Sequence, residues 1–131
     1  MSVPGRLGSI GVLAGLIAAP ALAVGLSPLA KEGLTAGPAK AFYLTVINPY
    51  PQPREFRLYA EGEGGGAPLD ILPANPTIKG EGQRRVTVIL RDLDPGEIRE
   101  TRICAELARQ EGMIHARVCS RLLARRVAVR D

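Results

Sequence analysis

The sequence predicts a small all-β domain. Its 131 residues include 11 prolines and 15 glycines, which interrupt the chain at short intervals. Between these breaks lie short runs in which apolar and polar residues alternate, and no long segment has the spacing of an amphipathic helix. Short strands separated by turn residues are typical of β-sandwiches and β-barrels.

The first 23 residues have the composition of a cleavable signal peptide. Arg6 supplies a positive charge, residues 7–19 are apolar apart from Ser9 and glycines, and Ala21-Leu22-Ala23 offers the small residues that signal peptidase accepts. An uncleaved membrane anchor is the alternative, but Pro20 interrupts a spanning helix, which needs about 20 apolar residues. We therefore expect an exported protein, periplasmic or secreted.

Residues 24–131 then form the mature protein, and their length is typical of one domain. The clearest strand is 40–48, in which Phe42, Leu44 and Val46 share a face. The other strands are expected at 26–29, at a sheet edge because of Pro28, and at 55–60, 69–72 and 84–91. Turns or loops are expected at 33–38, at the proline-rich segment 48–53, and at 62–68, 79–82 and 94–96.

Residues 98–129 predict a hairpin followed by a long last strand. A tight turn at Glu111-Gly112 would gather a mostly apolar face, with the opposed pairs Ile103–Ser120, Ala105–Val118, Leu107–Ala116 and Arg109–Ile114. The other face would carry the pairs Cys104–Cys119, Glu106–Arg117 and Arg102–Arg121. The last pair has like charges, so one arginine is expected to turn away or to find Glu100.

Cys104 and Cys119 are the only cysteines, and this register sets them directly opposite each other. Opposed Cβ atoms in an antiparallel pair lie about 4.5–5.5 Å apart, near the separation that a disulfide needs. Export also favours a disulfide. A metal pair is the alternative, but two thiols and His115 complete only three ligands.

The composition argues against an enzyme. His115 is the only histidine, no acidic residue has a distinctive context, and the chain has no Trp. We expect no catalysis, no cofactor and no small-molecule substrate. Met113 and His115 could act as copper ligands, which leaves a periplasmic metal carrier as the least favoured function.

The net charge is +4, and five basic residues gather near the end of the chain: Arg117, Arg121, Arg125, Arg126 and Arg130. Such a group could attract nucleic acid, but an exported protein rarely meets any. A solvated strand face or a site for an acidic partner is the better interpretation.

Several segments together resemble the N-terminal immunoglobulin-like domain of the periplasmic chaperones that assemble pili with an usher. They are residues 25–29 (GLSPL), 44–49 (LTVINP), 71–76 (ILPANP), 78–88 (IKGEGQRRVTV) and 94–97 (DPGE). The resemblance implies one immunoglobulin-like β-sandwich of about seven strands. Some members of the family carry a disulfide between their last two strands, where Cys104 and Cys119 stand here.

The resemblance also implies that the last strand, residues 117–129, is an edge strand lent to a pilin-like or other envelope subunit. Its apolar positions are Leu122, Ala124, Val127 and Val129, with a change of phase at Arg125-Arg126 that indicates a bulge or the strand's end. Lys31, Arg125 and Arg126 are the candidates for holding the subunit's terminal carboxylate. Family members have a second domain, so a stand-alone immunoglobulin-like interaction module of the cell envelope is the alternative.

Overall fold

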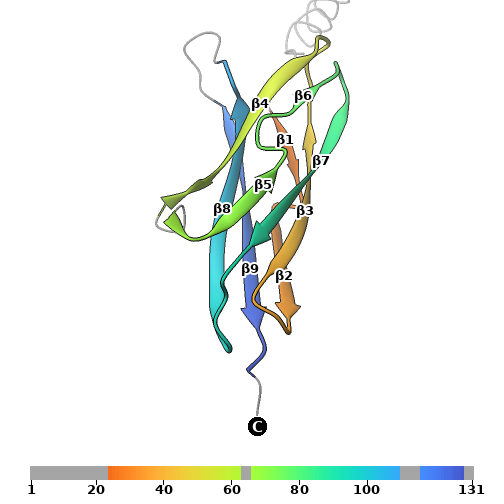
Figure 1. Ribbon diagram of the computed structural model, residues 1–131. Helices are drawn as coiled ribbons and strands as arrows, with labels where there is room; N and C mark the ends of the chain where they lie inside the picture. The colour runs from red at the N-terminus through yellow and green to blue at the C-terminus, as the bar shows by residue number, and fades with distance from the viewer. Residues whose placement is uncertain (1–23, 63–65, 110–115, 129–131) are drawn as a thin grey trace, which may run out of the picture.

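The computed structural model describes residues 24–62, 66–109 and 116–128, which form two packed β-sheets (Figure 1). The strands are β1 (Gly25–Ser27), β2 (Ala30–Thr35), β3 (Lys40–Ile47), β4 (Arg54–Glu61), β5 (Leu69–Leu72), β6 (Thr77–Ile78), β7 (Gln83–Leu90), β8 (Ile98–Leu107) and β9 (Arg117–Arg126). The predicted all-β sandwich is confirmed.

The smaller sheet has the strand order β1-β3-β7-β5, and the larger sheet has the order β2-β9-β8-β4-β6. Neighbouring strands are antiparallel except β2 and β9, which run parallel. In the part of the chain that the structure describes, no helix has the length and apolar character needed to cross a membrane.

The beginning of the described chain takes part in both sheets. The strand expected at residues 26–29 is confirmed only up to Ser27, where β1 forms an edge of the smaller sheet. Pro28 has no N–H to donate and ends β1. The chain then crosses to the larger sheet as β2, which extends to Thr35 where the sequence predicted a turn.

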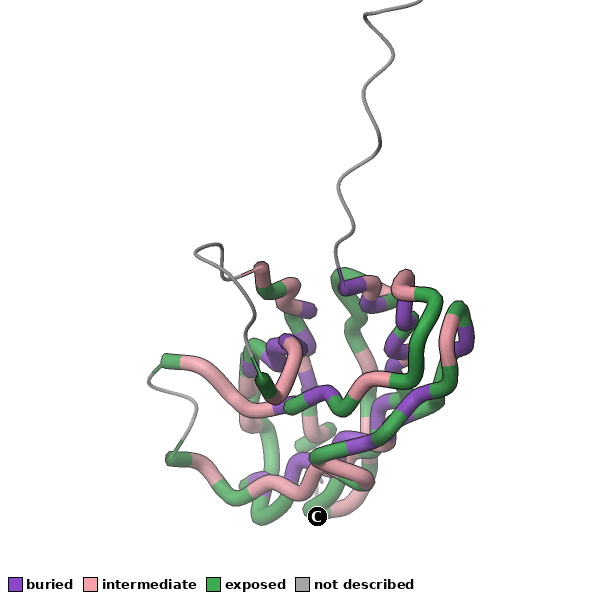
Figure 2. Tube along the Cα trace, turned by 90° about the horizontal axis from the view of Figure 1, so that it is seen from above, coloured by how far each residue is buried: buried purple, intermediate pink, exposed green. Residues whose placement is uncertain are grey.

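Alternation along the strands produces the core between the two layers. Phe42, Leu44 and Val46 of β3 are at most 2% exposed, as expected from their shared face. The rest of the core comes from every second residue of β7 in the same sheet and of β4, β8 and β9 in the facing sheet: Phe56, Leu58, Val86, Val88, Leu90, Ile103, Ala105, Leu122 and Ala124. Figure 2 shows buried segments, in purple, in strands of both layers.

Asn48 closes one end of the sandwich, in the turn predicted at residues 48–53. Its buried side-chain amide lies 3.0 Å from the carbonyl oxygens of Gln52, Ile78 and Lys79. The loop after β6 comes so close that a Cβ on Gly80 would lie 1.9 Å from the Pro51 oxygen. The turn is therefore held by one buried amide and by the absence of a side chain at residue 80.

The predicted register of the last two strands is confirmed. The pairing of β8 with β9 runs from Ile98–Arg125 to Glu106–Arg117 and sets Cys104 opposite Cys119. The predicted turn at Glu111-Gly112 and the partner Ile114 lie outside the described residues.

Substitutions at two neighbouring positions of β9 test this register. Leu122 is fully buried, whereas Leu123 points to the opposite, outer face. We expect Leu122→Ala to lower the free energy of unfolding by about 2–5 kcal/mol because it leaves a cavity. The matched change Leu123→Ala should cost about 1 kcal/mol or less. Urea denaturation measures both, and equal losses would contradict the assignment of faces.

Candidate protein-binding site

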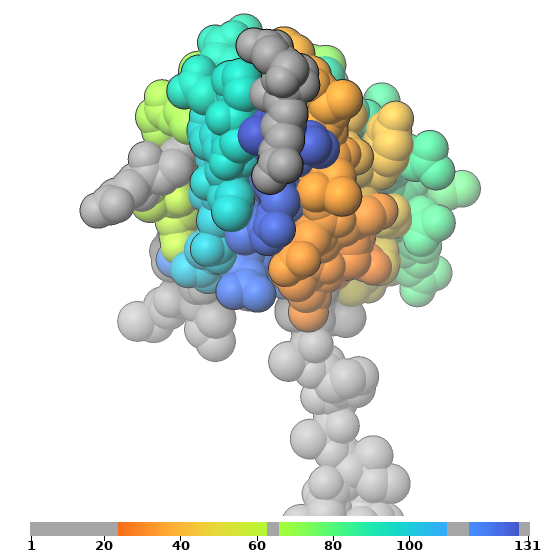
Figure 3. Space-filling view, turned by 90° about the horizontal axis from the view of Figure 1, so that it is seen from below, coloured from red at the N-terminus to blue at the C-terminus, as the bar shows by residue number. Residues whose placement is uncertain are grey.

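The strand predicted as a donor edge, β9, has a neighbour on each side. β8 lies on one side, and Arg121–Arg126 pair on the other side with Ala30–Thr35 of β2. Figure 3 shows β9 in blue between β8 in cyan and β2 in orange. The interpretation of residues 117–129 as an edge strand is therefore wrong over Arg121–Arg126.

The apolar positions assigned to that strand have different environments. Leu122 and Ala124 are both 0% exposed and pack in the core, so their side chains do not face a partner. Val127 is 50% exposed and follows the end of β9, where its N–H donates to the Thr35 carbonyl oxygen. Val129 lies outside the described residues. The change of phase at Arg125-Arg126 coincides with the observed end of β9 at Arg126.

Among the described residues, the free edge on this side of the larger sheet belongs to β2. Arg121 donates its N–H to the Leu29 carbonyl oxygen, and Val127 donates to that of Thr35, each at 2.9 Å. Backbone groups of successive strand residues point to opposite sides. The odd-numbered residues of β2 therefore bond to β9, and Ala30, Glu32 and Leu34 direct their N–H and C=O groups away from the sheet.

Two adjoining hollows lie along the groove between β2 and β9. The larger, of about 500 Å³, is lined by Glu32, Gly33, Leu34, Leu123 and Arg125. The smaller, of about 150 Å³, is lined by Ala30, Lys31, Glu32, Arg121 and Leu123. Both combine aliphatic side chains with charged ones, directly beside the free edge.

The three candidate carboxylate anchors do not form one site. Arg126 donates from Nη1 to the Leu93 carbonyl oxygen at 2.6 Å, which closes the end of the sandwich. Lys31 is paired in register with Leu122 and thus lies on the inner side of β2, whereas Arg125 is paired with Leu34 on the outer side. Of the three, only Arg125 lines the larger hollow.

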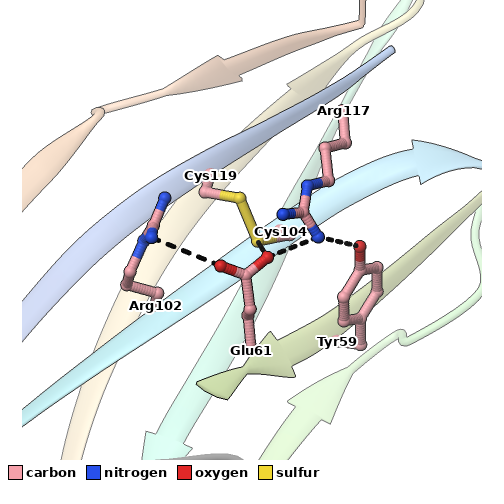
Figure 4. Close-up of a disulfide and its surroundings, with 6 residues drawn as sticks. All are labelled: Tyr59, Glu61, Arg102, Cys104, Arg117 and Cys119. Atoms are coloured by element: carbon pink, nitrogen blue, oxygen red, sulfur yellow. Dashed lines mark hydrogen bonds and ion pairs between the residues drawn. A yellow bond between two sulfur atoms is a disulfide. The ribbon is translucent and has the colours of Figure 1, made fainter. Parts of the chain in front are cut away.

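Cys104 and Cys119 form the predicted disulfide, on the outer face of the larger sheet (Figure 4). Glu61 of β4 lies beside it, with a carboxylate oxygen 3.6 Å from the Cys104 sulfur. Although Glu61 and the two sulfurs lie within 4.8 Å of one another, the sulfurs are bonded to each other and are not free thiolate ligands. Met113 and His115 lie outside the described residues.

Ion pairs surround the disulfide, but they are not those expected from the hairpin alone. Glu61 pairs with Arg117 and, at 3.3 Å, with Arg102. A hydrogen bond to Tyr59 and the nearby Glu61 carboxylate hold the pKa of Arg117 above its ordinary value. Glu106, which faces Arg117 in register, pairs instead with Arg57 of β4.

Each arginine of the like-charge pair Arg102–Arg121 has a carboxylate partner, as expected. Arg102 turns to Glu61, and Arg121 lies 3.5 Å from Glu100. The hairpin pattern could not indicate Glu61, because β4 is distant from β8 in the sequence although it is adjacent in the sheet.

Comparison with known proteins finds no matching family and no matching curated protein. Among solved structures, the chain is similar to the E. coli chaperone DraB (20% identity, TM-score 0.62, 83% of this chain and 57% of DraB). It is also similar to the structure of the Salmonella enterica SafB chaperone with the SafA pilin (16%, TM-score 0.66, 87% of this chain and 59% of that one). A third match is PapD-like domain 7 of human CEP192 (14%, TM-score 0.66, 88% and 93%).

These matches confirm the predicted resemblance at the level of the fold, which is the immunoglobulin-like fold of pilus-chaperone N-terminal domains. The chain spans less than three fifths of the two matched chaperone structures.

Removal of the disulfide tests its contribution to stability. A cross-link between residues separated by 15 positions is expected to contribute about 3 kcal/mol through the entropy of the unfolded chain. We expect the double variant Cys104→Ala/Cys119→Ala to lose about that amount in urea denaturation. Dithiothreitol should lower the urea midpoint of the unmodified protein to near that of the double variant and leave the midpoint of the variant unchanged. A urea midpoint of the unmodified protein that is the same with and without the reductant would contradict this expectation.

Proposed function

We propose that this chain is an exported, non-enzymatic binding protein of the pilus-chaperone type. It binds an extended segment of another envelope protein by strand addition to the larger sheet. The observation that supports this most is the free edge of β2, where three residues present backbone groups that no described strand pairs with. Backbone hydrogen bonds at such an edge provide affinity, and neighbouring side chains provide specificity.

The similar proteins agree with a protein partner. SafB was solved in complex with the SafA pilin, and another similar structure is described as a chaperone–tip adhesin complex. The partner of this chain is accordingly a pilin-like or other envelope subunit. The edge that we assign to it is β2 rather than the predicted β9, because β2 covers Arg121–Arg126.

Export is proposed from two features. Residues 1–23 have the pattern of a signal peptide, and the only two cysteines are joined, as is usual in oxidising compartments.

Mass spectrometry of the chain recovered from the periplasm tests export. We expect a mature protein that begins at Val24 and contains no free thiol, because cleavage after Ala23 precedes oxidation in the periplasm. A chain that keeps residues 1–23, or cysteines that react with a thiol reagent without prior reduction, would overturn this part of the proposal.

Proline at an outward-facing backbone position tests strand addition. Glu32→Pro removes an N–H that points away from the sheet and leaves the hydrogen bonds of β2 to β9 in place. We expect the Glu32→Pro variant no longer to capture the envelope proteins that the unmodified chain captures from a periplasmic extract. Glu32→Ala is the matched control, since it removes the same side chain and keeps the N–H. Equal capture by Glu32→Pro, with unchanged thermal unfolding, would exclude addition at this edge.

A further inference from the structure

Cations from three strands border the free edge of β2. Lys31 lies on its inner side and Arg125 on its outer side, as the pairing with β9 requires. Lys40 of β3 reaches the edge at Gly33, where a Cβ would lie 2.5 Å from Lys40 Cε and 3.3 Å from its Nζ. The missing side chain of Gly33 therefore leaves the space that Lys40 occupies.

These three cations are not neutralised by any described residue. Among the described residues, no carboxylate forms an ion pair with Lys31, Lys40 or Arg125. Lys40 lies 5.8 Å from the centre of the Phe42 ring, an attraction that leaves its charge in place. Glu32 is the only acidic residue of β2, so the edge carries an excess of positive charge.

Apolar surface accompanies this charge. Leu34 is 65% exposed and Leu29, directly before β2, is 59% exposed. Leu34 also lines the larger hollow together with Leu123 and Arg125. A strand added at the edge would therefore meet aliphatic side chains and cations side by side.

The geometry points to an acidic, extended polypeptide segment as the occupant of this edge, with aspartate or glutamate alternating with apolar residues. This inference rests on the proposed strand addition and specifies the partner. An extended polypeptide satisfies the backbone groups of Ala30, Glu32 and Leu34. Its carboxylates, which all project to one side, meet Lys31 and Lys40 on the inner side, while its apolar residues lie beside Leu34 on the outer side. A nucleic acid or another polyanion could use the cations only.

Three synthetic peptides of roughly eight residues, with capped ends, test the inference. Valine occupies every second position in all three. The alternate positions carry glutamate, glutamine or lysine. Each is titrated into the ¹⁵N-labelled protein while amide shifts are followed by NMR. We expect the glutamate peptide to shift the amides of Ala30, Glu32 and Leu34, with a Kd at least about five-fold below that of the glutamine peptide. This preference should shrink between about 50 and 500 mM NaCl, and the lysine peptide should not saturate.

A charge variant supplies the matched control. The triple change Lys31→Gln/Lys40→Gln/Arg125→Gln should bring the Kd values for the glutamate and glutamine peptides together. Arg85→Gln makes the same kind of change on β7 of the smaller sheet, where Arg85 lies over Tyr43, and should preserve the difference.

The outcomes separate this inference from the proposed function. Equal Kd values for the glutamate and glutamine peptides, with shifts at β2, would keep strand addition and overturn the acidic preference. Shifts of the β2 amides by heparin equal to those by the glutamate peptide would overturn it in favour of a general polyanion surface. No shift at β2 with any peptide would overturn both.

Discussion

The antiparallel pairing of β8 with β9 is the constraint on which the rest of the structure depends. Because side chains alternate along a strand, a slip by one residue would turn Leu122 and Ala124 out of the core. The opposition of Cys104 and Cys119 holds the observed register by a covalent bond. It also decides which residues of β9 line the groove beside β2, since Leu123 and Arg125 reach the outer face only in this register.

The same register explains how charge is distributed over the outer face of the larger sheet. Four arginines there have carboxylate partners: Arg57, Arg102, Arg117 and Arg121. Arg125 lies further along β9 than Arg117 and Arg121, and it forms no ion pair with a described carboxylate. The positive charge that remains is therefore concentrated toward β2, at the side of the sheet where backbone groups are also unpaired.

Most of the fold follows from local patterns in the sequence. The alternation of Phe42, Leu44 and Val46 predicts β3 and its buried face, and the apolar and cysteine pairs predict the last hairpin. β2 could not be predicted in this way, because Ala30–Thr35 contain Lys31, Glu32 and Gly33 and show no alternation. What makes these residues a strand is the unpaired side of β9, a partner about ninety positions away in the sequence. The candidate site was misassigned for the same reason, since an edge is a property of the whole sheet rather than of one strand.

Pro28 separates two short strands that belong to different sheets, and this joint has a mechanical consequence. A force along β2, applied through a bound segment, would load the hydrogen bonds between β2 and β9 in shear. The force would also be transmitted through residues 28 and 29 to β1. Both layers would then share the force on this flank. The connection through Pro28 thus links the two sheets covalently at the flank where the force would act.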